Sequence, residues 1–423
     1  MCGIAGYSDP SGSSDKSHLH AMSRSLACRG PDDFGLLVSD SCGLVHRRLS
    51  IIDPEGGRQP IRNEDETLAI VCNGEVYDYG QLREELMARG HRFRTGSDNE
   101  VILHLYEEDG ADCVQRLNGM FAFAILALET GQIFLARDRF GQKPLFYARK
   151  DSRFAFASGP AALVELPWID DAVDAGAIHD YLAYQYIPEP RCIYRDISKL
   201  PPHSHGLWDG NELRIESYWE PRIMVETGQS YVQAQRQLRE QLGAAVVRRL
   251  VADVPVGIFL SGGLDSSIIA SLAVRNAARA NDVHTFSVGF PSTAYDEREY
   301  ANAVAEHLGT DHHFREVQPG DFEHLAQVVS AFEEPFADSS MLPTALLARF
   351  TRQHVKVGLS GDGADELFGG YYRYRVMHLA RLLARCPRGL RRRIKGILLS
   401  LLPAAKDERS VTGRIRRLAE IAD

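Results

Sequence analysis

One short run, Ser261-Gly262-Gly263-Leu264-Asp265-Ser266-Ser267, combines the residue types that bind phosphate. Glycines leave the backbone open, so consecutive N–H groups and the N-terminus of a following helix can surround an anion. Serine hydroxyls suit phosphate oxygens, and the carboxylate of Asp265 suits a Mg²⁺ ion. The run lacks the lysine of the GxxxxGK[ST] pattern, so it is not the P-loop of kinases and GTPases. An ordinary strand-turn-helix corner is the alternative, and the full run disfavours it.

A second Ser-Gly turn, Ser360-Gly361-Asp362-Gly363-Ala364-Asp365-Glu366, follows the apolar stretch 355–359. In open α/β sheets, ligands bind at the carboxyl ends of the strands. A surface turn rich in acids is the alternative. It is disfavoured because the same order of strand, Ser-Gly and acid occurs at both places.

Cys2 follows the initiator methionine, so removal of Met1 would give it a free α-amine. The pKa of such an amine lies near neutrality, which makes it a suitable internal base for the thiol of the same residue. Burial of Cys2 as a small apolar residue in a first strand is the alternative.

Three further polar positions can hold a small substrate. Arg48 stands at a short strand, and its guanidinium can bind a carboxylate with two parallel hydrogen bonds. Asn73-Gly74 by itself predicts a hairpin turn, but its N–H groups can also face a developing oxyanion. Asp98 precedes a predicted helix, 99–108; it can cap that helix, or it can receive an ammonium group.

The elements around these residues divide the chain into two halves. Alternating strands in the first half indicate a sandwich of two antiparallel sheets between helices, closed by a hairpin at 203–219. The boundary falls between 210 and 225, after which helices and strands alternate, as is typical of a parallel sheet. There we expect strands at 254–260, 284–290 and 355–359, and helices at 231–250, 297–308 and 342–352.

Composition excludes several classes of protein. The 423 residues are 44% apolar, enough for two domains, and the net charge of −9 gives no general support for nucleic-acid binding. Seven cysteines without regular spacing indicate neither a disulfide framework nor a zinc site. Without a signal peptide or a membrane-length apolar run, we expect a cytoplasmic protein. The basic segment 381–423 is either an amphipathic membrane helix or, as we favour, a solvated helix packed on its own domain.

The first half resembles the glutaminase domain of class II glutamine amidotransferases, and most of all that of glutamine-hydrolysing asparagine synthetases. The resemblance rests, in chain order, on Cys2, Arg29-Gly30-Pro31-Asp32, Arg48, Asn73-Gly74-Glu75 and Asp98. It implies an Ntn-type αββα sandwich over 1–215, with Cys2 attacking the side-chain amide of glutamine and Asn73 and Gly74 forming the oxyanion hole. It also implies that glutamine is bound by Arg48, Ile51, Asn73, Gly74, Glu75 and Asp98. Cys28 departs from the histidine that is common in relatives, and we interpret the family-like segment 137–145 as structural.

The second half resembles the synthetase domain of the same family. The resemblance implies a parallel-sheet, adenine-nucleotide α-hydrolase-like domain over 216–423, whose first loop binds pyrophosphate as ATP is cleaved to AMP. The implied ATP-binding residues are Leu260, Ser261, Gly262, Gly263, Asp265, Ser266, Val288, Ser360 and Gly361. Asp265 and Asp365 would hold Mg²⁺, and Asp362 would support formation of an acyl-adenylate. Relatives continue beyond this point with further acceptor-site residues, so we expect the second domain to be incomplete.

The expected activity is asparagine synthesis from glutamine, ATP and aspartate. Ammonia released at Cys2 would pass through the interior to a β-aspartyl adenylate, giving asparagine, glutamate, AMP and pyrophosphate. Other relatives amidate peptides or sugar acids, and these acceptors stay open; closure of a β-lactam ring needs no ammonia, so Cys2 argues against it. A glutaminase-only protein is the second alternative. The sequence is compatible with a homodimer.

Overall fold

The computed structural model describes residues 1–10, 15–224, 228–290 and 296–371, together with scattered residues between 373 and 397. It divides into two compact units, residues 1–359 and 360–423, which we describe separately. The helix expected within 381–423 lies almost entirely outside the described residues. Within the described ranges, no helix is both long enough and apolar enough to cross a lipid bilayer.

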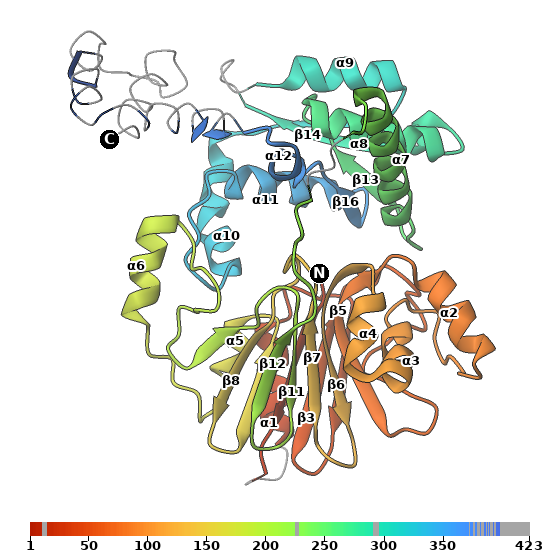
Figure 1. Ribbon diagram of the computed structural model, residues 1–423, viewed down its shortest axis with the longest axis vertical. Coiled ribbons are helices and arrows are strands. Elements are labelled where there is room, and N and C mark those ends of the chain that lie inside the picture. The colour runs from red at the N-terminus through yellow and green to blue at the C-terminus, as the bar shows by residue number, and fades with distance from the viewer. Residues whose placement is uncertain are drawn as a thin grey trace. The chain divides into compact units, whose positions relative to one another are not determined.

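Two six-stranded antiparallel sheets form the first half of the larger unit (Figure 1). The first sheet contains, in spatial order, β10 (Ile197–Lys199), β8 (Phe146–Lys150), β9 (Arg153–Ala157), β1 (Gly3–Ser8), β3 (Cys42–Arg48) and β2 (Asp33–Val38). The second sheet contains β12 (Leu213–Ser217), β11 (Ser204–Trp208), β7 (Ile133–Arg137), β6 (Gly119–Ala127), β5 (Leu68–Val76) and β4 (Ile61–Arg62). The predicted closing hairpin is confirmed, because β11 and β12 pair antiparallel.

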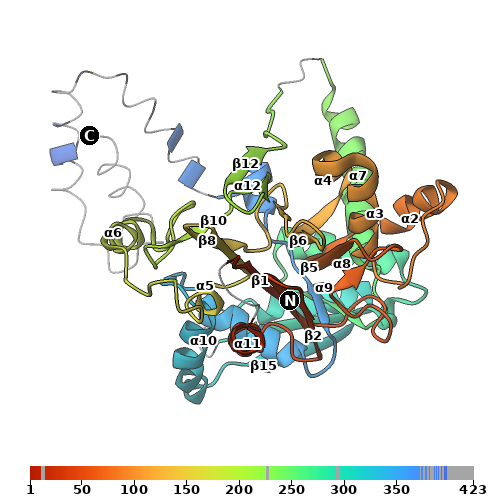
Figure 2. The same cartoon turned by 90° about the horizontal axis from the view of Figure 1, so that it is seen from below.

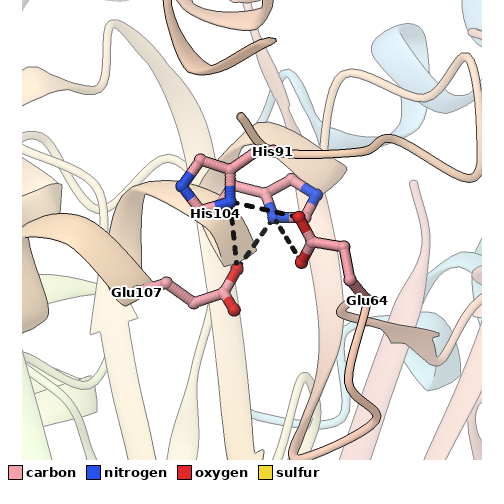
Figure 3. Close-up of side chains that lie close together, drawn as sticks. All are labelled: Glu64, His91, His104 and Glu107. Atoms are coloured by element: carbon pink, nitrogen blue, oxygen red, sulfur yellow. Dashed lines mark hydrogen bonds and ion pairs between the residues drawn. The ribbon is translucent and has the colours of Figure 1, made fainter. Parts of the chain in front are cut away.

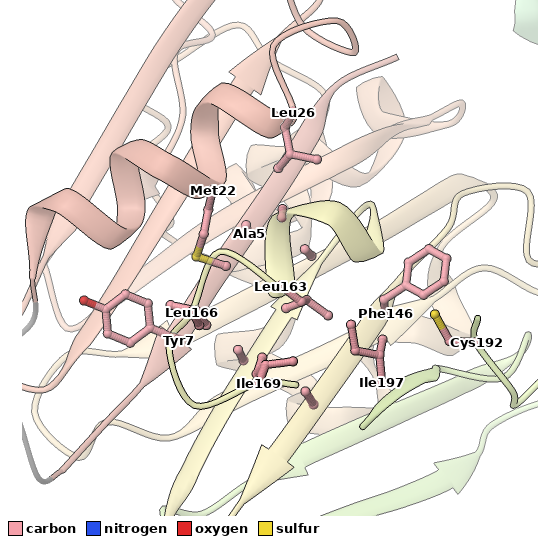
Figure 4. Close-up of a cluster of buried hydrophobic side chains, with 14 of the residues drawn as sticks. Ala5, Tyr7, Met22, Leu26, Phe146, Leu163, Leu166, Ile169, Cys192 and Ile197 are labelled. Carbon is pink, nitrogen blue, oxygen red and sulfur yellow. The ribbon is translucent and has the colours of Figure 1, made fainter. Parts of the chain in front are cut away.

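Apolar side chains hold four layers together. Ile4 and Leu44 from the first sheet pack with Val71 and Leu135 from the second. The outer face of the first sheet is covered by α1 (Lys16–Ser25) and α5 (Pro160–Leu163). Figure 4 shows the buried apolar side chains that these helices share with the sheet. The helices that follow in the chain, α2 (Tyr79–Ala88), α3 (Glu100–Asp109) and α4 (Cys113–Arg116), share a core with the second sheet (Figure 2). The expected αββα sandwich is therefore confirmed.

A four-stranded parallel sheet forms the rest of the larger unit. Its spatial order is β15 (Asp311–Glu316), β14 (His284–Gly289), β13 (Val256–Phe259) and β16 (Val357–Leu359). The helices of this half are α7 (Tyr231–Arg249), α8 (Leu264–Asn276), α9 (Arg298–Leu308), α10 (Leu325–Ala331) and α11 (Met341–Thr351), while α6 (Ala175–Tyr184) precedes the hairpin. The expected alternation is confirmed. Strand β13 is shorter than expected and begins after Pro255, which has no N–H to donate.

The Glu333-Glu334 segment of the second half is packed against the first half. Glu334 pairs with buried Lys199 at 2.9 Å and accepts a hydrogen bond from the N–H of Ile193 at 3.0 Å. Glu333 accepts one from the N–H of Ala161, also at 3.0 Å. Charged groups this poorly exposed must be paired, so these contacts are part of the fold of the unit.

Candidate functional site

A cavity of about 350 Å³ lies in the larger unit, and seven residues selected from the sequence line it. These are Cys2, Arg48, Ile51, Asn73, Gly74, Glu75 and Asp98. Strand pairing explains part of this arrangement: Gly3 pairs with Arg47, which brings the residues before β1 beside the end of β3. Strand β5 supplies Asn73, Gly74 and Glu75 from the second sheet.

The thiol of Cys2 is held at the loop that follows β3. Its Sγ accepts a hydrogen bond from the N–H of Leu49 at 3.4 Å and lies 3.7 Å from the carbonyl oxygen of the same residue. Burial raises the pKa of the thiol, so a base is needed to form the thiolate. The α-amine of Met1 is also buried, which lowers its pKa to about 6. An α-amine with a pKa near 6 is largely unprotonated at neutral pH, as a general base must be.

Asn73 and Gly74 lie inside β5, so the hairpin turn that the pair predicts by itself is wrong. Asn73 is buried, and its Nδ2 has no hydrogen-bond partner within the described residues. An unpaired buried donor is costly unless a ligand uses it. A Cβ at Gly74 would lie 2.3 Å from the carbonyl oxygen of Met120, so only glycine fits against β6 there.

Arg48 is buried and fixed by the loop that follows it. Its guanidinium donates to the carbonyl oxygens of Ile52, Asp53 and Pro54 at 2.6–3.1 Å. Because a guanidinium has five N–H groups, two remain for a ligand in the cavity.

Two carboxylates face the same cavity. Burial raises the pKa of Glu75, and it raises the pKa of Asp98 to about 7. Asp98 accepts a hydrogen bond from the N–H of Val76 at 2.8 Å. The cap position of α3 is Asn99, so the capping role considered for Asp98 is wrong. A cation in the cavity would offset the cost of ionising these acids.

Lys143 is a cavity residue that the sequence did not single out as functional. Burial lowers the pKa of its ammonium group, while the charges of Glu75 and Cys2 oppose that effect. The structural interpretation of its neighbours is supported: Asp138 accepts hydrogen bonds from three N–H groups of the loop that leads to Lys143 and from the N–H of Phe121. That loop carries Lys143 to the cavity, and no local pattern other than the family-like segment marks it.

Lys356 and the first two residues of β16, Val357 and Gly358, complete the wall; they lie about 300 residues from Arg48 in the chain. Lys356 Nζ pairs with Asp32 at 2.6 Å, and Asp32 also accepts a hydrogen bond from the N–H of Ser50 at 2.9 Å. The cavity is therefore built from both halves of the larger unit.

The first glycine loop has the geometry of an anion site. Gly262 has φ +79°, and a Cβ there would lie 2.4 Å from the backbone carbon of Tyr300, so glycine is required. Gly263 caps α8, and the Ser261 and Ser266 hydroxyl oxygens are 3.0 Å apart. This places N–H groups at the N-terminus of a 13-residue helix directly after β13.

The other nucleotide-site candidates are arranged as follows. Leu260 is buried at the end of β13, and Val288 lies in β14. Asp265 lies in the first turn of α8, and its carboxylate is the type of ligand that Mg²⁺ prefers.

The second Ser-Gly turn belongs to the smaller unit. Ser360 Oγ donates to Asp362 Oδ2 at 2.9 Å, and Asp365 lies in the first turn of α12 (Ala364–Phe368). The shared metal site of Asp265 and Asp365, and the nucleotide contacts of Ser360 and Gly361, stay predictions.

Comparisons with known proteins match both halves. A glutamine amidotransferase domain family model matches residues 1–219, and an asparagine synthase family model matches residues 237–423. The chain is 36% identical over 399 residues to asparagine synthetase [glutamine-hydrolyzing] 1 of Bacillus subtilis, covering 93% of this chain and 62% of that protein. It is 35% identical over 440 residues to putative asparagine synthetase [glutamine-hydrolyzing] 2 of Methanocaldococcus jannaschii, covering 96% and 82%. The chain thus spans only part of the length of these curated relatives.

Proposed function

Because the chain belongs to the family of glutamine-hydrolysing asparagine synthetases, we propose that it is an ATP-dependent carbon–nitrogen ligase that takes its nitrogen from glutamine. The observation that carries the proposal is the cavity in which Cys2 lies with Asn73, whose buried amide nitrogen has no partner within the described residues. A nucleophile beside an unused donor is the arrangement that amide hydrolysis requires.

In the first step, Cys2 Sγ attacks the side-chain amide carbon of glutamine. The α-amine at the N-terminus takes the thiol proton, and Met1 must be removed for that amine to be the one on Cys2. The developing oxyanion accepts hydrogen bonds from Asn73 Nδ2 and the Gly74 N–H. The C–N bond then breaks, ammonia leaves with the transferred proton, and water hydrolyses the thioester to glutamate.

Charges in the cavity orient the substrate. The two remaining N–H groups of Arg48 bind the α-carboxylate, and the backbone at Ile51 lines the same wall. Asp98 and Glu75 receive the α-ammonium, which favours their ionised forms and so lowers the pKa values that burial raises.

In the second step, the proposed acceptor is the β-carboxylate of aspartate. The loop at Ser261 binds the pyrophosphate of ATP through backbone N–H groups, and Ser360 and Gly361 contact AMP. Asp265 and Asp365 would hold Mg²⁺, which offsets the charge of the departing pyrophosphate. Asp362 supports formation of the β-aspartyl adenylate, which ammonia converts to asparagine and AMP. Peptide or sugar-acid acceptors are the alternative for this step.

The test uses the whole chain with Cys2→Ala, and with Cys28→Ala as the matched control because Cys28 is an exposed thiol. We expect Cys2→Ala to abolish glutamine-dependent amidation while leaving ammonia-dependent amidation and release of AMP and pyrophosphate. The control should keep both activities. Equal loss of both activities in Cys2→Ala contradicts the two-site scheme. If the unmodified chain has glutaminase activity but does not convert ATP to AMP, that result supports a glutaminase-only protein.

A further inference from the structure

Two histidines and two glutamates converge on the helical side of the second sheet, and none of them lines the cavity that holds Cys2. Glu64 comes from the turn between β4 and β5, His91 from the loop after α2, and His104 and Glu107 from α3 (Figure 3). Residues 104 and 107 lie one turn apart on the helix, so their side chains face the same way. His104 is fully buried, Glu64 and His91 are partly buried, and Glu107 is exposed.

The spacing of the four donor groups suits a small cation. His104 Nδ1 lies 2.8 Å from Glu107 Oε2 and 3.4 Å from Glu64 Oε2. His91 Nδ1 lies 3.2 Å from Glu64 Oε1 and 3.7 Å from Glu107 Oε2. With metal–ligand bonds of about 2.1 Å, neighbouring ligands of a tetrahedral site are about 3.4 Å apart. Two of the four distances are shorter than that value, one equals it and one is longer. One ligand atom from each residue lies within 4.8 Å of all the others.

The outward ring nitrogens face a second set of carboxylates. His91 Nε2 lies 3.0 Å from Glu108 Oε1. His104 Nε2 lies 3.6 Å from Oε1 of buried Glu100, too far for a hydrogen bond, and it has no hydrogen-bond partner within the described residues. Histidines that bind metals donate their other N–H to a carboxylate, carbonyl or water, which directs the first nitrogen to the ion. His91 Nε2 has such a carboxylate partner, whereas His104 Nε2 does not; both Nδ1 atoms lie within 3.7 Å of the two shared carboxylates.

We propose that Glu64, His91, His104 and Glu107 form a structural site for a divalent transition metal, with Zn²⁺ the ion of best fit. Two imidazoles and two carboxylates match the ligand preference of zinc, whereas Mg²⁺ and Ca²⁺ prefer oxygen ligands alone. Four protein ligands close the coordination sphere, so the role is structural. The ion would fix the loop that runs from His91 to Asp98, and it thereby ties the site to the cavity wall.

The test titrates the chelator-stripped whole chain with ZnCl₂ by calorimetry, and with CoCl₂ by visible absorption, which reports tetrahedral coordination. We expect one equivalent of each ion to bind. His91→Gln should weaken binding by at least about 100-fold, and Glu108→Gln, which removes only an outer partner, by about 10–100-fold. The control is His284→Gln in a separate group with Asp311 and His313, which should leave the affinity unchanged.

Circular dichroism checks that each variant folds; Glu108 is on the surface, so its variant keeps the test valid if His91→Gln does not fold. Three outcomes overturn the proposal. In the first, no stoichiometric ion binds, and the four groups are then only a network of hydrogen bonds and ion pairs. In the second, wild-type affinity persists in both His91→Gln and Glu108→Gln. In the third, binding is lost in His284→Gln alone.

Discussion

Replacing Asp98 with asparagine removes the negative charge of the proposed ammonium site without changing the size of the side chain. The buried carboxylate accepts hydrogen bonds from the N–H of Val76 at 2.8 Å and the hydroxyl of Ser97 at 3.4 Å. The amide oxygen of asparagine can accept the first, and its NH₂ group can donate to the hydroxyl. The variant therefore isolates the effect of charge.

We expect Asp98→Asn to stabilise the folded protein, because burial raises the pKa of Asp98 from 3.8 to about 7. One pKa unit corresponds to about 1.36 kcal/mol, so the ionised carboxylate costs the folded state up to about 4 kcal/mol. Because the folded-state pKa is the higher one, the cost is absent below about pH 4 and grows as pH rises. It reaches about 2 kcal/mol at pH 5 and about 4 kcal/mol at pH 8. Asparagine carries no such cost.

Thermal unfolding at pH 5 and pH 8 measures this difference. At about 2–4 °C per kcal/mol, Asp98→Asn should raise the midpoint by about 10 °C at pH 8 and by about half of that at pH 5. The same substitution should lower the affinity for glutamine, although it raises the stability of the protein. Loss of one partner of a buried ion pair costs about 3–5 kcal/mol, which is at least about 100-fold in Kd. Calorimetry in a Cys2→Ala background measures this, because that background does not consume glutamine.

The two measurements can refute the two parts of the reasoning separately. A stability difference that does not widen from pH 5 to pH 8 would contradict the buried-charge argument. Unchanged glutamine affinity would contradict the assignment of Asp98 to the ammonium, and Glu75→Gln would then show whether the other carboxylate of the cavity receives it.

Three further predictions concern the proposed oxyanion hole, the first glycine loop and the cavity wall at Lys356. Asn73→Ala removes one of the two proposed oxyanion donors and should lower kcat for glutamine hydrolysis by about 100–1000-fold with little change in KM, measured as glutamate release. Gly262→Ala would place its Cβ 2.4 Å from the backbone of Tyr300. We therefore expect the variant to lose ATP-dependent release of pyrophosphate and to keep glutaminase activity. Loss of both activities would instead show general misfolding. Lys356→Met breaks the partly exposed pair with Asp32 and should raise KM for glutamine about 5-fold, for a loss of about 1 kcal/mol; an unchanged KM would show that β16 does not shape the pocket.

Sequence patterns located the parts of the molecule that are made by neighbours in the chain. The glycine loop is an example, because strand, turn and helix follow one another within residues 256–276. The motifs identify the cavity residues, but they do not predict the backbone conformation of Asn73 and Gly74. Asn73-Gly74 has the composition of a hairpin turn, yet pairing with β6 on one side keeps it extended. Here tertiary pairing overrides local preference.

Structural features that are built by residues far apart in the chain have no comparable signal in the sequence. Lys356 reaches the cavity only because β16 lies at the edge of the parallel sheet that faces it, which depends on the packing of both halves. Likewise, His91 and His104 belong to different elements, and their convergence with Glu64 depends on how α3 lies on the second sheet. Single-sequence periodicity reports which face of an element is apolar, and it does not report which elements meet.

The pairing of Glu334 with Lys199 limits how the protein can be dissected. A fragment cut at residue 219, where the first family match ends, would keep Lys199 and lose Glu334, which pairs with it at 2.9 Å. The ammonium would keep the carbonyl of Ile187 at 2.7 Å, but removing the segment that carries Glu334 would also expose the charge to water. A fragment that ends at residue 219 would thus lack the contacts that Glu333 and Glu334 make with Ala161, Ile193 and Lys199.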